Sequence, residues 1–223
     1  MYLERLSILI EGLRKEAIGE PRWNAEKQAY EYKEESAKVV AILKLVRAMH
    51  GVSSLELLCS NGLFIDAGAI MRGVNDCTSE IYFLLENFPN TSDKVNQFVE
   101  GFFGATIDGY LSNETPPVQS KKVRSAVVRV LKGQHDDATQ KRLERIFAAF
   151  SGYVHASYAH TMEVYNGATA VFNLRGVPEE TQRRMKMEYA KVAAVAVVHA
   201  GAFIAKTLGL TELQNEFMRL DPS

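Results

Sequence analysis

The stretch GAIMRGVNDCTSEIYFLLEN, residues 68–87, decides the fold class of this 223-residue chain. Its apolar side chains recur every three or four residues, which is the spacing of the buried face of an α-helix; they are Ile70, Val74, Cys77, Ile81 and Leu84. Upstream, Ser53 and Glu56 have the spacing of a capping box, which marks a helix start. We therefore predict one long amphipathic helix from Ser53 to about Asn87.

The same period recurs over most of the chain and predicts a single all-α domain, a bundle of seven to eight helices. Further helices are expected at about 2–17, 25–50, 92–111, 118–132, 136–154 and 178–208, followed by a short tail helix. Gly51 is expected to end the second of these. The segment 155–177 mixes β-branched residues with turn formers and predicts either a short hairpin or a long loop. The core is expected over about 25–210, between an N-terminal helix and turn (1–24) and a C-terminal tail (211–223).

The composition is that of an ordinary soluble globular protein, with 47% hydrophobic and 24% charged residues and a formal net charge of −1. No overall field draws the chain to nucleic acid or to a membrane, so such binding needs a local patch. His199 and Lys206 interrupt the most apolar run, 192–210, which is rich in alanine and is expected to be a buried core helix. The first residues carry Glu4 and Glu11 without a small-residue cleavage site, which argues against a signal peptide.

The two cysteines, Cys59 and Cys77, are both expected in the long helix described above. A helix rises 1.5 Å per residue, so the two would lie about 27 Å apart, too far for a disulfide. Free, buried thiols are typical of a reducing compartment. The expected location is therefore the cytoplasm, with no membrane partner.

A polar flank runs along the 68–87 stretch, where Arg72, Asp76 and Glu80 follow one another at four-residue spacing. Arg72 and Asp76 can form an ion pair at this spacing. Asp66 falls at the edge of the apolar face, where a carboxylate is expected either to pair with a neighbouring helix or to have a raised pKa. The flank is either a structural network between helices or part of a functional site.

The stretch SGYVHASYAH, residues 151–160, is the second candidate site. His155 could act as a general acid or base oriented by Ser151, or it could simply satisfy carbonyls at a helix end. If the helix ends just after His155, that residue could join His160 and Glu163 in a metal site. The chain has no HExxH, CxxC, GxSxG or glycine-rich phosphate motif, so no cofactor and no metal are expected.

The segment 121–145 holds eight basic side chains against three acidic ones. An RNA phosphate backbone can bind such a surface, whereas the alternative is a solvated amphipathic face whose charge is balanced elsewhere. The candidate nucleic-acid contacts are Lys121, Lys122, Arg124, Arg129, Arg142 and Arg145.

Two of these segments, the 68–87 stretch and FSGYVHAS at 150–157, resemble bacterial HEPN-like helical proteins, which share a glycine- and alanine-rich helix with an Arg then a Glu and a later S-x-x-V-H segment. The likeness extends over about 40–210. The resemblance implies an all-α fold, a homodimer, and a metal-independent endoribonuclease that acts on RNA or nucleotides in defence, toxin–antitoxin or stress systems.

The catalytic signature of that family is an Arg followed, after four to six residues, by a His. Arg129 and His135 match it formally, but Gly133 breaks the helix that should carry both. The segments that carry the resemblance point instead to Arg72, Glu80, His155 and Ser151.

In this interpretation His155 moves the proton, Arg72 stabilises phosphate charge and Glu80 orients Arg72. The rival hypothesis is a non-catalytic binding or regulatory module. Its Arg72–Glu80 network is structural, and its alanine-rich last helix is a surface for a second copy or a protein partner.

Overall fold

The computed structural model describes residues 2–104 and 118–221, and the fold is all-α, as predicted. The helices in these ranges are α1 (Tyr2–Ile18), α2 (Ala37–Ser60), α3 (Phe64–Leu85), α4 (Asp93–Phe103), α6 (Ser120–Lys132), α7 (Asp137–Val154), α8 (Tyr158–Met162), α9 (Glu180–Thr207) and α10 (Thr211–Arg219). Two short antiparallel hairpins pair β1 (Arg22–Asn24) with β2 (Ala29–Glu31) and β3 (Tyr165–Asn166) with β4 (Val171–Phe172). Residues 105–111 of the helix expected at 92–111 lie outside the described ranges.

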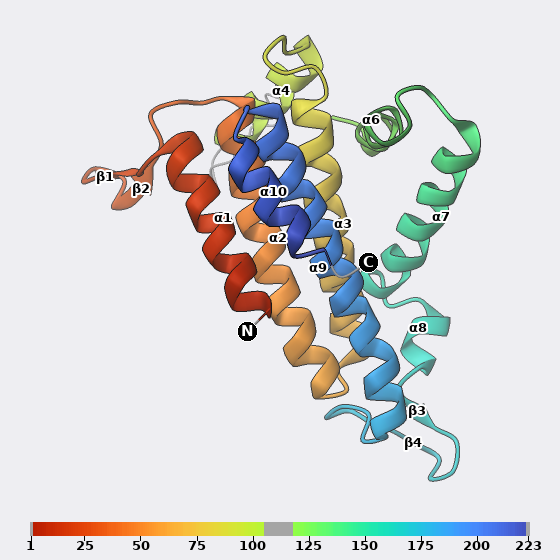
Figure 1. Cartoon of the computed structure of the whole chain (residues 1–223). Helices are drawn as coiled ribbons and strands as arrows, with labels where there is room; N and C mark the ends of the chain where they lie inside the picture. The colour runs from red at the N-terminus through yellow and green to blue at the C-terminus, as the bar shows by residue number, and fades with distance from the viewer. Residues whose placement is uncertain (1, 105–117, 222–223) are drawn as a thin grey trace.

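Helices α2, α3 and α9 pack against one another at the centre of the bundle. Helices α1 and α10 cover one side of this group, and α6 and α7 pack against α3 on the other side (Figure 1). The β3–β4 hairpin lies at one end of the bundle, and α4 lies at the other (Figure 1). The large apolar core draws buried side chains from α1, α2, α3, α4, α6, α9 and α10. This arrangement leaves α7 at the outer edge of the molecule, where one of its faces meets solvent.

The prediction of a helix at 25–50 is wrong for its first part, which belongs to the β1–β2 hairpin. The Asn24 side chain accepts hydrogen bonds from the backbone N–H groups of Glu26 and Lys27 and so fixes the turn. Trp23 and Tyr30 pair across the strands with ring centroids 5.1 Å apart. Local turn chemistry therefore outweighs the helical period here, and α2 begins only at Ala37.

Gly51, which was expected to end a helix, lies buried in the middle of α2. A Cβ at this position would overlap Val74 of α3, so the glycine permits close approach of the two helices. Ser53, expected as the N-cap of the next helix, instead donates its hydroxyl to the Met49 carbonyl (3.3 Å). Both residues therefore continue α2.

The break comes at Gly62, whose φ is +72°. The N–H of Gly62 donates to the Cys59 carbonyl (3.1 Å) and the N–H of Leu63 donates to the Leu58 carbonyl (2.9 Å). These two bonds close a Schellman motif, in which a left-handed glycine ends the helix. The long helix predicted from Ser53 is thus two packed helices, α2 and α3.

The two cysteines lie on different helices, so the argument from their separation along one helix is wrong. Cys59 is in α2 and Cys77 is in α3; both are free and buried, as expected. Burial raises the pKa of the Cys77 thiol to about 11. Both thiols therefore stay protonated and unreactive at neutral pH.

Helix α9 is the described helix that is long and apolar enough to cross a membrane by length and composition. However, 56% of its most apolar window is buried inside the protein, as in the core helix of a soluble protein. Six of the seven alanines between 190 and 205 are buried, and Gly201 lets the ring of Phe217 approach. The alanine-rich face is therefore part of the core, which corrects the hypothesis that it is a partner surface.

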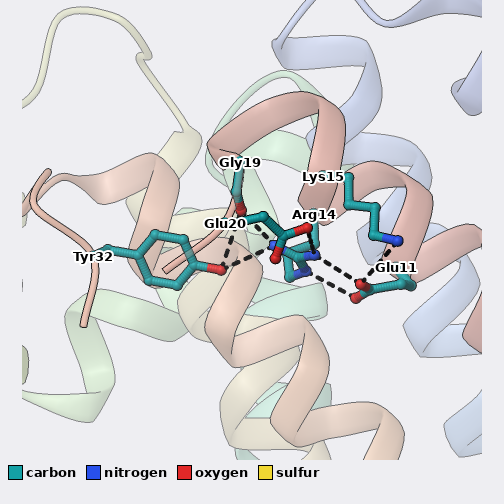
Figure 2. A network of polar contacts seen from close by, with 6 residues as sticks. All are labelled: Glu11, Arg14, Lys15, Gly19, Glu20 and Tyr32. Carbon is teal, nitrogen blue, oxygen red and sulfur yellow. Dashed lines mark hydrogen bonds and ion pairs between the residues drawn. The ribbon is translucent and has the colours of Figure 1, made fainter. Parts of the chain in front are cut away.

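An arginine network joins the end of α1 to the segment that follows β2 (Figure 2). Arg14, which is 9% exposed, donates to both carboxylate oxygens of Glu11 (2.8 and 2.7 Å) and to Glu20 (2.9 Å). It also donates to the Gly19 carbonyl and to the Tyr32 hydroxyl (3.3 Å). The hydrogen bonds to Glu11 and Glu20 raise the pKa of Arg14 further above its ordinary value. One guanidinium thus satisfies the helix end and fixes the chain between α1 and α2.

We expect Arg14→Met to lower the free energy of unfolding by about 2 kcal/mol, because several charge-assisted hydrogen bonds are lost. The loss stays moderate because Glu11 and Glu20 are more than half exposed and remain hydrated. Arg14 lowers the pKa of Glu11 in the folded protein. The contribution of this ion pair to the free energy of unfolding is therefore complete above the ordinary glutamate pKa, and it disappears as the pH falls through the lower, folded-state pKa. Urea unfolding at neutral and acid pH measures both effects. Arg5→Met, at an exposed arginine of the same helix, is the control and should change little.

Candidate functional site

Arg72 connects α3 to α7. Its Nε donates to Asp76 Oδ2 (2.7 Å), which confirms the ion pair predicted from the spacing. Its Nη1 donates to the carbonyl of Phe147 and to the Ser151 hydroxyl, both at 2.9 Å. The structure therefore brings together Arg72 and Ser151, two of the four residues proposed as catalytic, and it uses most of the Arg72 donors within the protein.

Phe147 lies between two arginines. The Arg72 guanidinium carbon is 4.7 Å from the ring centroid and that of Arg124 is 5.1 Å from it, so both cations contact a buried aromatic ring. Arg124 Nε is buried and has no hydrogen-bond partner within the described ranges. Arg124, expected as a nucleic-acid contact, is thus half-buried between α6 and α7 and has a packing role.

Glu80 does not orient Arg72, which corrects the role expected for it. Glu80 lies two helical turns from Arg72, about 12 Å along the axis, and this distance is beyond the reach of the two side chains. It pairs instead with Lys44 of α2 (2.7 Å). Burial raises the pKa of Glu80, and Lys44 partly offsets that effect. Asp76, one turn away from Arg72, takes the orienting position.

Asp66 is exposed in the first turn of α3, so water solvates its carboxylate and it needs no partner on a neighbouring helix. A helix beginning at Ser53 would have placed Asp66 in its interior, and the true start at Phe64 removes that constraint. A carboxylate in the first turn is favoured by the positive end of the helix. Asp66 is therefore a helix-start residue in contact with solvent.

His155 is the C-cap of α7, and its side chain is exposed. Its backbone N–H donates to the Ser151 carbonyl (3.1 Å). Across the residues that the structure describes, no hydrogen bond or ion pair joins the His155 imidazole to another side chain. The expected orientation of His155 by the Ser151 hydroxyl is not observed, because that hydroxyl accepts from Arg72. The position matches the alternative of a helix-terminal histidine.

The proposed metal set of His155, His160 and Glu163 is not assembled. His160 Nδ1 is 2.6 Å from the Ser157 hydroxyl, and both oxygens of Glu163 have protein partners. Within 2–104 and 118–221, no group of three His, Cys, Asp or Glu side chains could hold a metal ion. The metal-dependent hydrolase hypothesis therefore has no ligand set in this region.

Glu163 belongs instead to a network that sequence reasoning missed. Lys186 of α9 bonds Glu163 Oε2 (2.5 Å) and the Tyr153 hydroxyl (3.1 Å), and that hydroxyl donates to Glu163 Oε1 (2.7 Å). The Lys186 ammonium also lies over the rings of Phe64 and Tyr189, 5.6 and 4.9 Å from their centroids. Burial lowers the pKa of Lys186, but its bonds to Glu163 and Tyr153 outweigh this and raise it. Burial and Glu163 also raise the pKa of Tyr153.

This network holds α7, α8 and α9 together, and its members come from three distant positions in the chain. A lysine flanked by two methionines, in the sequence Arg-Met-Lys-Met at 184–187, was the available signal, since apolar neighbours suggest a half-buried lysine stem. The spacing from Tyr153 to Lys186 carries no helical period, so sequence periodicity could not connect them.

The six residues expected to contact nucleic acid do not form one patch. Arg124 packs on Phe147, and Arg129 forms two bonds to Glu86 (2.5 and 2.8 Å). Lys121 and Lys122 are exposed at the start of α6. Arg142 and Arg145 are exposed on α7 together with Lys141.

Helical spacing places Lys141, Arg142 and Arg145 on one solvent-facing side of α7. These three residues are called the α7 basic face below. None of them forms an ion pair with any residue in the described parts of the chain. The face therefore presents three exposed cations, none of them held in an ion pair within the described ranges, to an external partner.

Within the described ranges, Arg72 is bonded to Asp76, Phe147 and Ser151, and no hydrogen bond orients the His155 imidazole. Comparison of the chain with protein-family models, with curated proteins and with solved structures finds no match.

Proposed function

We propose that this protein is a non-catalytic module that binds RNA through the α7 basic face. The observation that carries the proposal is the row of Lys141, Arg142 and Arg145, three exposed cations without a carboxylate partner among the described residues. Such a row can neutralise successive phosphates of a nucleic-acid strand and release the counterions bound to them. Because the chain as a whole is nearly neutral, this attraction is local.

Binding rather than catalysis is supported by the state of Arg72 and His155. Stabilising a phosphate in a transition state requires donors that point at the reacting group. The Arg72 Nε and Nη1 groups instead bond Asp76, Phe147 and Ser151. In this proposal the role of Arg72 is structural: its bonds join α3 to α7 and keep α7 packed against the core.

The proposal is tested by reversing the three charges of the α7 basic face together, as Lys141→Glu, Arg142→Glu and Arg145→Glu. Loss of three phosphate contacts should weaken binding to a single-stranded RNA about a hundredfold at roughly 0.1 M salt and lower the salt slope by about 2. Fluorescence anisotropy over a range of salt concentrations measures both quantities.

The matched control reverses Arg5, Arg22 and Lys33, three exposed cations on α1 and near the β1–β2 hairpin, on the far side of the bundle from α7 (Figure 1). It changes the net charge equally and should leave affinity within about threefold, because distant surface charges are screened. Equal losses in both variants, or no RNA binding by the native protein, would refute the proposal. Equal affinity for DNA of the same sequence would replace RNA by single-stranded nucleic acid.

A second candidate function is the metal-independent ribonuclease implied by the HEPN-like resemblance. The observation that favours it is the bond between Arg72 and Ser151, one turn before a solvent-exposed His155. Its test is incubation of the native protein and His155→Ala with total RNA and tRNA, with and without EDTA. Cleavage that resists EDTA and is lost in the variant would establish the nuclease and overturn the non-catalytic proposal.

We also propose that the protein is a cytoplasmic homodimer that acts in defence or stress. The free, buried thiols support a reducing compartment. A dimer would use a surface other than the alanine-rich side of α9, because those alanines lie in the core. Light scattering at several protein concentrations gives the oligomeric state directly.

A further inference from the structure

A cavity of about 550 Å³ opens apart from the α7 basic face, between the end of α3, the turn that follows it, the start of α4 and α6. This volume is within the range of small-molecule sites. Four cationic side chains line it: Lys94 from α4, and Lys121, Lys122 and Arg129 from α6. The cavity therefore gathers three of the six basic residues that were expected on an RNA surface.

An arginine already compensates the carboxylate that the described lining contributes. Among the described lining residues that carboxylate is Glu86, and Arg129 binds both of its oxygens at 2.5 and 2.8 Å. Arg129 thereby also covers the negative, C-terminal end of α3, where Glu86 is the C-cap. The three lysines form no ion pair with other residues of the described ranges, so their charge is available to a ligand, although Lys94 Nζ also donates to Gln97 Oε1 (2.8 Å).

Hydrogen-bond donors complete the lining. Asn87, Asn90 and Gln119 contribute side-chain amides that make no hydrogen bond to other residues in the described part of the chain. Helix α6 begins at the cavity, and its N-cap residue, Gln119, provides no side-chain cap. The positive end of a helix favours an anion. Cations, amides and a helix start thus converge on one open pocket.

We propose that this cavity binds the phosphate groups of a nucleotide, either a free nucleotide or the phosphorylated end of an RNA strand. Phosphate is the anion that best matches several point charges together with neutral N–H donors. Lys121 and Lys122 lie in the first turn of α6 and Lys94 in the first turn of α4, so the three ammonium groups reach the cavity from two helices and can contact more than one phosphate group. The proposal does not depend on the α7 basic face, since none of the three residues of that face lines the cavity.

The test is calorimetric titration of the native protein with adenosine diphosphate and with inorganic pyrophosphate at low salt. Both should bind, and the double variant Lys121→Gln/Lys122→Gln should lower each affinity about tenfold or more, because two charged hydrogen-bond donors are removed. The control is Arg22→Gln/Lys33→Gln, which removes the same charge at two exposed cations outside both the cavity and the α7 basic face. It should leave affinity within about twofold, because charges outside the cavity are screened.

Competition identifies the source of the phosphate. If a 5′-phosphorylated RNA displaces adenosine diphosphate and its 5′-hydroxyl form does not, the cavity holds an RNA end; if neither RNA competes, it holds a free nucleotide. The proposal is overturned if adenosine diphosphate, pyrophosphate and 5′-phosphorylated RNA all fail to bind, or if the two double variants lose affinity equally. Because these variants differ from the triple reversal on α7, the two proposals can fail separately.

Discussion

Gly62→Ala is expected to lower the free energy of unfolding by about 4 kcal/mol, the largest effect of any change considered for this protein. The φ of Gly62 is +72°, a conformation that costs an L-residue about 1–2 kcal/mol. A Cβ at this position would also overlap the backbone of Val177, whose N–H donates to the Gly62 carbonyl (3.0 Å). Because the obstacle is backbone, relief requires moving the segment that leads into α9. Urea denaturation measures the change.

Substitutions at two other glycines distinguish the cost of a positive φ from the cost of the overlap that an added Cβ would make. Gly209 has φ +74° and open space where a Cβ would lie, so Gly209→Ala should lose only about 1 kcal/mol. Gly73 lies in α3 with open space around it, so Gly73→Ala should be neutral or stabilise by up to about 1 kcal/mol. If Gly62→Ala costs no more than Gly209→Ala, the contact between the α2–α3 turn and Val177 does not constrain the fold.

Lys186→Met is expected to destabilise the protein by about 3 kcal/mol. The substitution keeps an unbranched stem among the rings of Phe64, Tyr153 and Tyr189, so the loss is mainly electrostatic. It leaves the Glu163 carboxylate without its ammonium partner, and removing one member of a desolvated pair costs more than the pair contributes. This expected loss of stability lies near the lower end of the range for breaking a buried ion pair, because the Glu163 side chain is 31% exposed. Urea denaturation gives the total, and hydrogen exchange should show α8 and the β3–β4 hairpin opening first.

The control for this prediction lies just over one turn along the same helix. Lys191 pairs with Glu188 (2.6 Å), but both side chains are mostly exposed, so Lys191→Met should change stability by less than about 0.5 kcal/mol. The double variant Lys186→Met/Glu163→Gln should recover part of the loss, because no unpaired charge then remains. A double variant that is as unstable as the two single losses combined would show that the two groups do not interact.

The core face of α3 could be predicted from periodicity alone. Of the five residues predicted for this face, Val74, Cys77, Ile81 and Leu84 are buried, and Ile70 is partly buried against the same core. The candidate site could be predicted only in part. The Arg72–Asp76 pair follows from four-residue spacing within one helix, whereas the contact from Arg72 to Ser151 depends on α7 crossing α3 at that level.

The sequence by itself determined where amphipathic helices form and how most of them end, because these signals lie within a few neighbouring residues. Gly133, at φ +70°, ends α6 as its position after a basic amphipathic run predicts. Only the tertiary structure decided which glycine ends a helix and which one permits close packing. Gly51 and Gly62 both follow apolar helical runs. The side chain of Val74 packs closely against Gly51, whereas the backbone of Val177 packs closely against Gly62.

Tertiary structure also decided the partners of the charged residues. Glu80 pairs with Lys44 because α2 lies beside α3, and Lys186 pairs with Glu163 because the C-terminal end of α8 comes within reach of the Lys186 side chain of α9. Electrostatic pairing falls off within a few ångströms, and residues far apart in the chain reach that distance only when the helices have packed. The helical period is a property of the chain, whereas the partner of each charge is a property of the packed bundle.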